Sequence, residues 1–511
     1  MLTKYCFGAH AETGAVTAAV KEGEALPYFS AVKEGKGTRF CCPLGEDDVV
    51  FGLGETMRGI DKRGGRYVSF NTDNPHHADD MPSLYGSHNF FIVDGERTFG
   101  AFFDTPARII FEIDYEGSGK IDVLAEQGVT VYLVEGESAN DIARQFLAAI
   151  GRSYLPPLWA FGFGQSRWGY KTEKDVRKIA DRYKKAGMPL EYICLDIDYM
   201  DRYIDFTVNK KRFPDMKGLV KEMKARGVRL VPIVDAGIKI EPHNPVYEEG
   251  VKEGYFCKNL EGKDFQAAVW PGMTHFPDFL QAKAREWFGR QYKFYTDLGF
   301  EGFWNDMNEP AIFYSEYNTS RLGDKSCGDP LYKGGARLSD YKSFTHNVDG
   351  KTVSHWDVHN IFGAKMTEAS SEGLEKLLDK RFLLFSRSSY IGAHRYGGIW
   401  TGDNSSTFHM LRRNVTMMPG LNMCGFLFSG ADTGGFGGNC SRELLLRWLA
   451  FSVFTPLMRD HTAIFTRNQE CFRYRGKRDF RSILSLRYRL LPYIYSEFMK
   501  AALSSDLYIR P

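Results

Sequence analysis

Residues 301–310 read EGFWNDMNEP and place two carboxylates directly after an apolar, strand-like run. The run ends at Trp304, and Asp306 and Glu309 follow it. A carboxylate at the end of a buried strand is costly unless a partner or a substrate needs it. The segment therefore indicates a functional site, at which a carboxylate can act as an acid, a base or a nucleophile.

Polar side chains also end seven other apolar runs of the chain. They are Gln165, Arg167 and Trp168; Asp196 and Asp198; Asp235; Arg387; Asp403; Asp432; and Arg459, Asp460 and His461. Such a set suits a polyhydroxylated ligand, because carboxylates accept hydroxyl hydrogen bonds and tryptophan faces stack on sugar rings. A metal site is the competing interpretation. The usual spacing of metal ligands is missing, so we predict no metal and no cofactor.

The elements that would position these residues alternate between strand and helix. The strand-like runs lie at 160–164, 191–200, 229–237, 299–308, 381–389, 398–403, 423–432 and 455–461. Helix patterns lie between them, for example at 173–187, and another ends the chain. Eight β-then-α units predict an α/β fold, a (β/α)8 TIM barrel over 156–511, with insertions near 238–280 and 310–370. The strand ends of such a barrel meet at one rim, where active sites lie.

Residues 1–155 have a different pattern, with short strand candidates between glycine and acidic turns. One candidate hairpin spans 88–104. We expect an N-terminal β-sandwich domain here, followed by a junction at the two prolines 156 and 157.

Composition limits the possible partners and the location. The chain has 511 residues and a formal net charge of +2, without a block of like charge, so neither nucleic acid nor an anionic membrane is expected as a partner. It lacks a run of about 20 apolar residues and an N-terminal secretory signal. Nine cysteines without metal-type spacing fit a reducing cytoplasm. Whether the chain forms a homo-oligomer is left open.

Four motifs resemble those of glycoside hydrolase family 31. They are WNDMNEP at 304–310, RYGGIWTGDN at 395–404, SGADTGGF at 429–436 and MRDH at 458–461. The resemblance extends over nearly the whole chain, and within the family it is to bacterial α-glucosidases of the maltase/isomaltase kind. Family members usually continue into small β-domains after the barrel, whereas this sequence stops at DLYIRP, so a truncated sequence is one expectation.

The resemblance implies a catalytic pair. Asp306 matches the nucleophile of the family and Asp403 matches its general acid/base. In a retaining glycosidase, one carboxylate attacks the anomeric carbon, while the other protonates the leaving oxygen and later deprotonates water. The two carboxyl groups are then expected to stand about 5 to 5.5 Å apart. Glu309 is interpreted as a structural residue at the strand end.

The resemblance also implies a set of substrate-binding positions. They are Asp73, Trp168, Asp196, Trp270, Trp304, Met307, Arg387, Trp400, Asp432, Phe436 and His461. Asp73 matches an acidic residue on an N-terminal loop that reaches over the barrel mouth. Arg387 and His461 match positions that bind hydroxyls and orient the nucleophile, and Asp432 is expected to support them. The neighbouring His76, His77, Asp79 and Asp80 offer a metal interpretation that we rank lower.

Taken together, the residues and the resemblance predict a retaining, exo-acting α-glucosidase that releases terminal non-reducing glucose from short α-linked oligosaccharides. An α-xylosidase or another α-glycosidase of the same family is the first alternative, and an α-glucan lyase is less favoured. A non-catalytic sugar-binding protein is disfavoured because both candidate catalytic residues are present. Linkage preference is not predicted.

Overall fold

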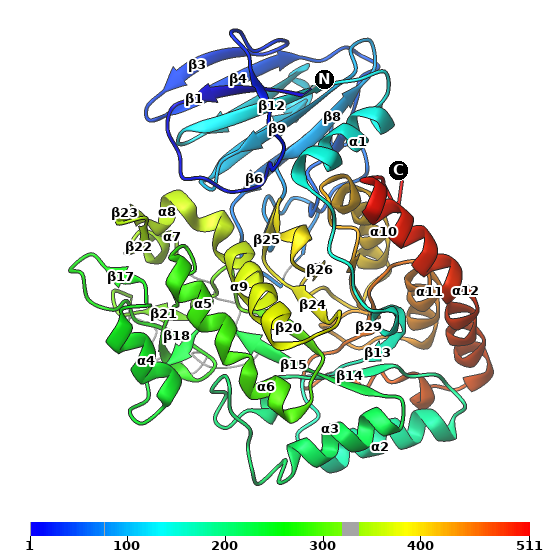
Figure 1. The fold of residues 1–511 in the computed structure, drawn as a ribbon. Coiled ribbons are helices and arrows are strands. Elements are labelled where there is room, and N and C mark those ends of the chain that lie inside the picture. The colour runs from blue at the N-terminus through cyan, green and yellow to red at the C-terminus, as the bar shows by residue number, and fades with distance from the viewer. Residues whose placement is uncertain (1, 76, 319–336, 511) are drawn as a thin grey trace.

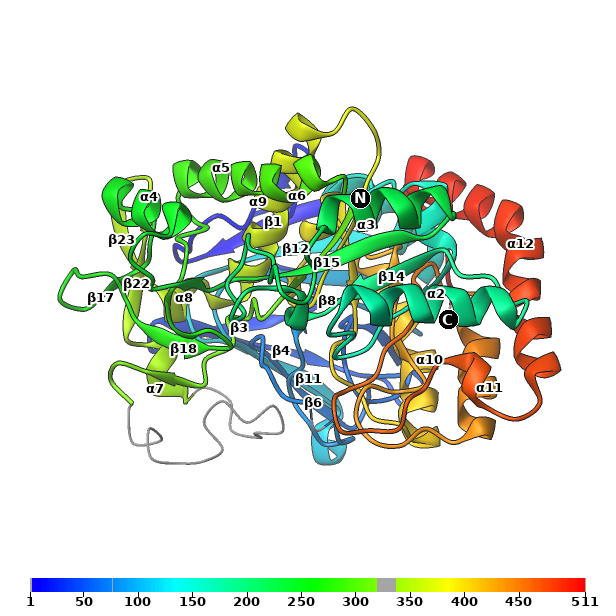
Figure 2. The same ribbon diagram turned by 90° about the horizontal axis from the view of Figure 1, so that it is seen from below.

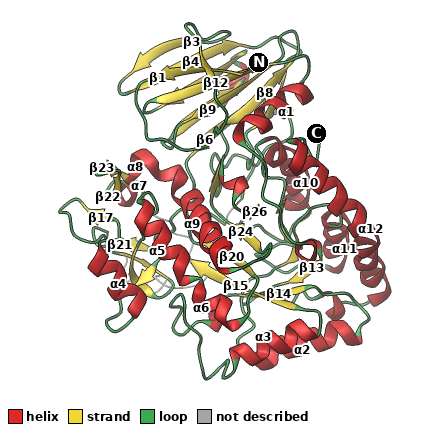
Figure 3. Cartoon of the chain, in the orientation of Figure 1, coloured by secondary structure: helices red, strands yellow, loops and turns green. Residues whose placement is uncertain are grey.

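A computed structural model describes residues 2–75, 77–318 and 337–510 of the chain. A layered β-domain lies at the top of Figure 1, above a larger body in which strands are surrounded by helices. Figure 3 shows the same division by element type. The predicted fold, an N-terminal sandwich before a TIM barrel, is confirmed.

The sandwich consists of two mainly antiparallel sheets. Their strand orders are β2-β1-β12-β9-β8-β5 and β3-β4-β11-β10-β6. The bounds are β1 Leu2–Phe7, β2 Lys21–Glu22, β3 Ser30–Glu34, β4 Gly37–Pro43, β5 Val49–Gly52, β6 Gly65–Ser69, β8 Phe90–Asp94, β9 Phe99–Asp104, β10 Ile109–Ile113, β11 Lys120–Ala125 and β12 Val129–Glu135. Burial alternates along β10, where Ile109, Phe111 and Ile113 face the core. This period of two buries one face of each strand between the sheets.

The barrel is a ring of parallel strands that matches all eight runs expected from the sequence. The strands are β13 Phe163–Gln165, β14 Tyr192–Leu195, β15 Arg229–Asp235, β20 Gly302–Asp306, β24 Leu383–Ser386, β26 Gly398–Trp400, β27 Ser429–Gly430 with β28 Asp432–Thr433, and β29 Met458–Asp460. The seventh position is split at Ala431: β27 pairs with β26, and β28 pairs with β29. The last strand, β29, pairs with the first, β13, and this pairing closes the ring.

Helices cover the outside of the ring, as Figure 2 shows from below. They are α2 Glu173–Lys185, α3 Met216–Ala225, α5 Ala282–Gln291, α6 Lys293–Leu298, α9 Phe362–Leu377, α10 Phe408–Met423, α11 Arg442–Ser452 and α12 Lys477–Ser504. The fifth unit differs from the expected pattern. Between β24 and β26 the chain forms only a short strand, β25 (Ser389–Tyr390), and the 3-10 helix η6 (Ala393–Arg395). This connection is too short and glycine-rich for an α-helix, and β25 pairs instead with β7 (Gly86–Ser87) of the N-terminal region.

Helix α2 illustrates how local sequence sets these boundaries. Thr172 and Asp175 form a reciprocal capping box at its N-terminus, which typically contributes about 1 kcal/mol. Val176, Ile179, Ala180 and Tyr183 are buried, which is the helical spacing of an apolar stripe. The stripe packs the helix on the barrel, and the helix leaves its solvent face charged.

Two small sheets stand beside the barrel mouth on long connections. One contains β16 Ile238–Lys239, β18 Ala267–Val269, β19 Gly272–His275 and β21 Tyr314–Ser315; the other contains β17 Lys258–Asn259, β22 Phe344–Val348 and β23 Lys351–Ser354. Short helices accompany them: α4 Pro245–Glu253, α7 Leu338–Tyr341, α8 His355–Val358 and η5 His359–Ile361. They lie at the left of Figure 1.

The sandwich and the barrel share a hydrophobic core. Helix α1 (Ala139–Ile150) lies against the outer face of the six-stranded sheet, where Phe146 stacks on Phe90 with ring centroids 3.7 Å apart. The buried cluster that contains both residues continues into the barrel, whereas a separate cluster fills the interior of the sandwich. Within the described ranges, we find no helix that is both long and apolar enough to cross a membrane.

Candidate active site

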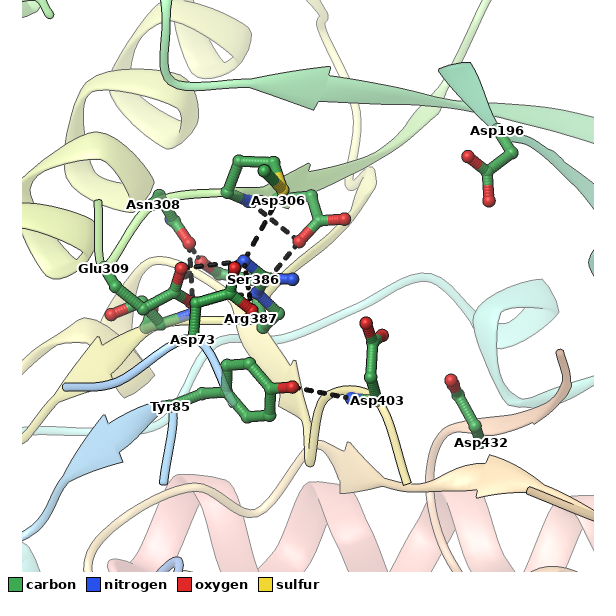
Figure 4. A network of polar contacts seen from close by, with 12 residues as sticks. Asp73, Tyr85, Asp196, Asp306, Asn308, Glu309, Ser386, Arg387, Asp403 and Asp432 are labelled. Carbon is green, nitrogen blue, oxygen red and sulfur yellow. Dashed lines mark hydrogen bonds and ion pairs between the residues drawn. The ribbon is translucent and has the colours of Figure 1, made fainter. Parts of the chain in front are cut away.

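Four aspartates from different barrel strands point toward one space at the barrel mouth (Figure 4). Asp306 ends β20, Asp196 follows β14, Asp403 follows β26 and Asp432 begins β28. In Figure 4 the carboxylates of Asp306 and Asp403 approach this space from opposite sides. The strand ends therefore bring together the carboxylates that the sequence placed at one rim.

Arg387 organises one side of this space. Its Nε and Nη2 donate to both oxygens of Glu309, at 2.9 and 2.7 Å. Nε also lies 3.0 Å from Asp306 Oδ1, and Nη2 lies 3.5 Å from Asp73 Oδ1. The guanidinium stands 4.8 Å from the ring centroid of Tyr85. One buried cation thus faces three carboxylates and an aromatic ring, which fixes its plane.

Asp306 is held by short-range contacts as well as by Arg387. Its Oδ1 accepts a hydrogen bond from the backbone N–H of Met307 at 2.8 Å. Met307 has a φ of 58°, an uncommon conformation for a residue with a side chain, and its sulfur lies 3.6 Å from Arg387 Nη2. The backbone turn after β20 therefore aims the Asp306 carboxylate into the mouth.

The surroundings of Asp403 favour its neutral, protonated form. Burial raises the pKa of its carboxyl well above 3.8, Arg387 opposes this rise, and the carboxylates of Asp306 and Asp73 add to it. Its backbone N–H donates to Tyr85 Oη at 3.4 Å. Asp403 is therefore a carboxyl group that can retain a proton, while Asp306 is in ion-pair contact with the Arg387 cation.

Asp196 and His461 form a second pair across the mouth. His461 Nε2 lies 3.6 Å from Asp196 Oδ2, and Asp196 Oδ1 accepts the N–H of Ile197 at 2.8 Å. Burial raises the pKa of Asp196 to about 8. Phe436 stacks on the His461 ring at 4.9 Å, and Trp304 meets it edge-on. His461 was expected to help orient the nucleophile, and the carboxyl group that it contacts is that of Asp196. Burial lowers the pKa of His461 well below 6.5, so the contact joins a neutral imidazole to this carboxyl.

Asp432 pairs with Arg459, whereas the sequence placed it in support of Arg387 and His461. The Arg459 guanidinium lies 4.6 Å from the ring of Trp304 and 5.2 Å from the ring of Trp400. Both charged residues come from neighbouring strands, β28 and β29, whose direct pairing brings Asp432 level with Arg459. Asp432 thus supports the aromatic wall through a buried cation.

Two tryptophans form another edge of the mouth. The rings of Trp168 and Trp270 are 5.1 Å apart and edge-on, and Phe313 packs against Trp270 at 4.8 Å. The backbone N–H of Trp168 donates to the carbonyl of Thr462, which fixes this edge to the segment after β29. The use of these aromatic rings as sugar-stacking surfaces stays a prediction.

Sequence reasoning gave Glu309 only a structural role and did not single out Tyr85. Both were hard to find because their partners are distant in the chain: Glu309 and Arg387 are separated by 78 positions. Asp306 and Arg387, by contrast, could be recognised as candidate site residues from the sequence, because each lies at the end of an apolar strand-like run.

The carboxylates of the mouth are not among the described groups of three or more side chains that come close enough together to hold a metal ion. Asp79 of the lower-ranked metal interpretation pairs with Arg413 and His409, and His76 lies outside the described residues. Within the part of the chain that the structure describes, Cys257, Asp278 and His346 form the one group of metal-binding type, and its atoms contact one another.

The family model for the "Glycosyl hydrolases family 31 TIM-barrel domain" matches residues 153–497. The chain belongs to glycosyl hydrolase family 31. A second model, the family 31 N-terminal galactose mutarotase-like domain, matches residues 22–112. Both matches agree with the barrel and the sandwich in the structure.

Relatives within family 31 include two microbial proteins named α-glucosidases. Alpha-glucosidase 2 of Bacillus thermoamyloliquefaciens is 38% identical over 500 residues, which are 96% of this chain and 60% of the relative. The α-glucosidase of Saccharolobus solfataricus is 33% identical over 475 residues, covering 90% of this chain and 68% of that protein. A crystal structure of a family 31 dextranase from Flavobacterium johnsoniae has a TM-score of 0.82 at 26% identity, covering 95% of this chain and 58% of its own.

Proposed function

We propose that this protein is a retaining α-glucosidase that removes terminal non-reducing glucose from short α-linked oligosaccharides. The observation that carries the proposal is the approach of Asp306 and Asp403 from opposite sides of one space. Of these two carboxylates, Asp306 is the one whose ion pair with Arg387 the structure shows. Membership of family 31 and two relatives named α-glucosidases support the same activity.

In this mechanism Asp306 is the nucleophile. Its carboxylate attacks the anomeric carbon, and the bond from that carbon to the leaving oxygen breaks as Asp403 gives this oxygen its proton. A covalent glycosyl ester on Asp306 remains. Asp403, now a carboxylate, takes a proton from water, whose oxygen attacks the anomeric carbon and frees Asp306. The raised pKa of Asp403 supports this division, because the first step needs the protonated acid.

Exo attack is supported by the N-terminal loop that carries Asp73. Asp73 contacts Arg387 from the sandwich side, so the loop lies over one edge of the mouth. Several buried polar atoms at the mouth have no hydrogen-bond partner among the described residues: both carboxylate oxygens of Asp235, Oδ2 of Asp432, and Nε1 of Trp304 and Trp400. Sugar hydroxyls supply both the donors and the acceptors that such atoms need.

Xyloside hydrolysis remains the alternative within the same mechanism. Xylose lacks the hydroxymethyl group, so the space between Trp168 and Asp196 would decide between the two sugars. The dextranase relative also makes α-1,6 linkages a substrate class to compare with α-1,4 linkages. A reducing cytoplasmic location is part of the proposal, and the cysteines of the described residues are all unpaired.

The test uses the wild-type protein, Asp306→Ala and Asp403→Ala with 2,4-dinitrophenyl α-glucoside, whose leaving group needs little acid assistance. We expect Asp306→Ala to release no dinitrophenol. Asp403→Ala should release one equivalent in a burst and then turn over slowly, because the ester forms but water is not activated. Asp297→Ala, at an exposed surface pair with Lys293, is the matched control and should be unchanged.

Wild-type turnover by Asp306→Ala would contradict the assignment. Initial rates on maltose, isomaltose and an aryl α-xyloside would rank the substrate classes. Proton NMR of the first product should show the α-anomer, and a first product in the β-anomeric form would contradict the retaining mechanism.

A further inference from the structure

Three buried histidines form a continuous line beside the barrel mouth. His346 Nδ1 lies 2.7 Å from Asp278 Oδ1, and His346 Nε2 lies 2.8 Å from His355 Nδ1. His355 Nε2 is 2.8 Å from His359 Nδ1, and His359 Nε2 is 2.7 Å from the carbonyl oxygen of Asn71. Four hydrogen bonds thus run from a carboxylate in the loop before α5 to the N-terminal loop. We call Asp278, His346, His355 and His359, together with the Asn71 carbonyl, the histidine line.

The surroundings of the line are almost entirely apolar. Phe344 stacks on His355 at 4.1 Å, Phe70 stacks on His359 at 3.8 Å, and Phe362 packs beside them. The other titratable groups that face the line are the thiol of Cys257, 3.6 Å from His346 Nδ1, and Tyr341 of α7, packed edge-on against His359. Burial raises the pKa of both groups well above their ordinary values, so both are neutral.

Counting hydrogens shows what the line must contain. Each of its four hydrogen bonds needs one hydrogen, and both of its ends, a carboxylate and a carbonyl, can only accept. Three neutral imidazoles carry three ring N–H groups in total. The four contacts can therefore form together only if the line holds one further proton.

We propose that His346 is an imidazolium paired with the Asp278 carboxylate, and that the resulting closed histidine line positions the N-terminal loop carrying Asp73 over the active site. His346 then donates at both ends, His355 and His359 each donate from Nε2, and Asn71 accepts the last hydrogen bond. The part of this inference that concerns Asp73 rests on the function proposed above; the proton count does not.

The placement of the proton follows from the groups at the two ends. Backbone N–H groups of Asn347 and Leu280 also donate to the Asp278 oxygens, at 2.7 and 3.3 Å, and such donors favour the ionised carboxylate. Burial lowers the pKa of His359 to about 3 and that of His355 well below 6.5, so both stay neutral. His346, next to the carboxylate, is the ring left to carry the charge.

A metal ion in place of the proton fits less well. Cys257, Asp278 and His346 are ligand types for zinc, but two ligands about 2.0–2.1 Å from a tetrahedral zinc stand about 3.3 Å apart. The 2.7 Å between Asp278 Oδ1 and His346 Nδ1 is instead an ordinary length for a charge-assisted hydrogen bond.

Asn71 connects the end of the line to the active site. Its N–H donates to Asn360 Oδ1 at 3.1 Å, and its Nδ2 donates to Ser388 Oγ at 2.8 Å, directly after Arg387. Two residues beyond Asn71, Asp73 reaches the Arg387 guanidinium. The backbone carbonyl that His359 holds is therefore part of the segment that sets the position of Asp73.

The proton count is tested by NMR on the full-length protein with nitrogen-15-labelled histidine at about pH 8, well above the ordinary histidine pKa of about 6.5. Nitrogen shifts distinguish protonated ring nitrogens from those with a lone pair. We expect four protonated nitrogens among the six of the histidine line, both of His346 included. Three would overturn the proposal, as would one equivalent of bound metal whose removal by a chelator changes the His346 shifts.

The positioning role is tested with His359→Phe and His359→Gln. The first removes the donor to Asn71, and the second offers an amide N–H near the position of Nε2. For an aryl α-glucoside we expect kcat/KM about tenfold lower in His359→Phe, and a return to within about twofold in His359→Gln. His275→Asn is the matched control: it alters a buried histidine of the same small sheets, bonded to Phe265 and outside the line, and should be unchanged.

Wild-type kinetics in a folded His359→Phe would overturn the positioning role, and so would a tenfold loss in His359→Gln. A failure of this proposal can be told apart from a failure of the proposed function, because the NMR count of protonated nitrogens needs no substrate. A protein without glucosidase activity but with four protonated nitrogens would refute the proposed function and leave the histidine line standing.

Discussion

At the scale of single residues, Arg387 is the group on which the proposed chemistry depends. A guanidinium among three carboxylates can hold Asp306 in place only if its own plane is fixed, and the two hydrogen bonds to Glu309 fix it. Glu309 is completely buried, so it acts on the site without reaching the mouth. We therefore regard Glu309 as a positioning residue.

Glu309→Gln should lower kcat/KM by about 10- to 100-fold, because a misplacement of about 1 Å at a catalytic group costs on this order. Glu301→Gln is the control. It lies just before the same strand β20, at the far end of the barrel, where it pairs with Lys224 and Lys380. Steady-state kinetics on an aryl α-glucoside decide the matter, and equal losses in the two variants would contradict the positioning role.

The raised pKa of Asp403 predicts the alkaline side of the pH profile. The first chemical step needs protonated Asp403, and its pKa lies well above 3.8, so activity persists above that pH and falls as the pH rises through the raised value. In Asp403→Ala, with dinitrophenyl α-glucoside, the burst rate should lose this alkaline limb. If the burst rate of the variant still fell at alkaline pH as in the wild-type protein, the fall would belong to the titration of another group.

The residue scale also shows what a sequence can reveal about a site. Asp306 and Asp403 could be placed at one rim because each lies at the end of an apolar strand-like run, and strand ends of a barrel converge; their selection as a catalytic pair came from the family motifs. The partnership of Asp432 with Arg459 was not identifiable, because it depends on the lateral pairing of β28 with β29. The histidine line was missed for the same reason, since Asp278, His346 and Asn71 lie on three separate segments.

At the scale of elements, the barrel strands could be predicted and their irregularities could not. Each strand is a short apolar run between turn residues, and this signal is local. The break at Ala431 is set by strand pairing, because β27 pairs with β26 and β28 pairs with β29, and the short strand β25 exists through its pairing with β7. Local sequence does not encode such pairings.

One buried cation helps to fix helix α12 on the barrel, in addition to the buried apolar residues of the helix. Arg487 is completely buried and donates to the carbonyls of Phe161, Val453 and Pro456 at 2.5–2.8 Å. It thereby ties α12 to the residues before β13 and to the end of α11. Removing it leaves three buried carbonyls without this donor.

Arg487→Met should lower the free energy of unfolding by about 3–5 kcal/mol, on the order found when a buried charged hydrogen-bonding group loses its network. Arg489→Met, on the exposed side of the same helix, should change it by less than about 0.5 kcal/mol. Urea unfolding followed by circular dichroism measures both. Similar shifts for the two variants would show that Arg487 does not have this role.

At the scale of the whole molecule, the sandwich and the barrel act as one unit. The hydrophobic cluster of the barrel includes Phe90 and Phe102 from the six-stranded sheet. Arg395, after β25, donates to the carbonyls of Gly14, Ala15 and Ile150. The loop that brings Asp73 and Tyr85 to Arg387 leaves the sandwich and returns to it.

We therefore expect a single thermal unfolding transition for the protein by calorimetry, with the calorimetric and van't Hoff enthalpies in agreement. Arg395→Met should lower the midpoint of that one transition, since it removes three contacts across the junction. Two resolved transitions in the wild-type protein would show that the shared core does not couple the two parts.

The closure of the barrel by β13 and β29 has a consequence for biosynthesis. A ribosome delivers the sandwich first and the first barrel strand next, but the partner of that strand is not made until Met458–Asp460 have emerged. During that interval α1 already packs on Phe90 and Phe102 through Phe146, but the barrel residues that complete this shared hydrophobic cluster are missing, and the incomplete barrel strands expose their own apolar residues. Nascent chains of this protein should therefore be clients of chaperones that recognise apolar surface, and the dependence should end once the last strand is released.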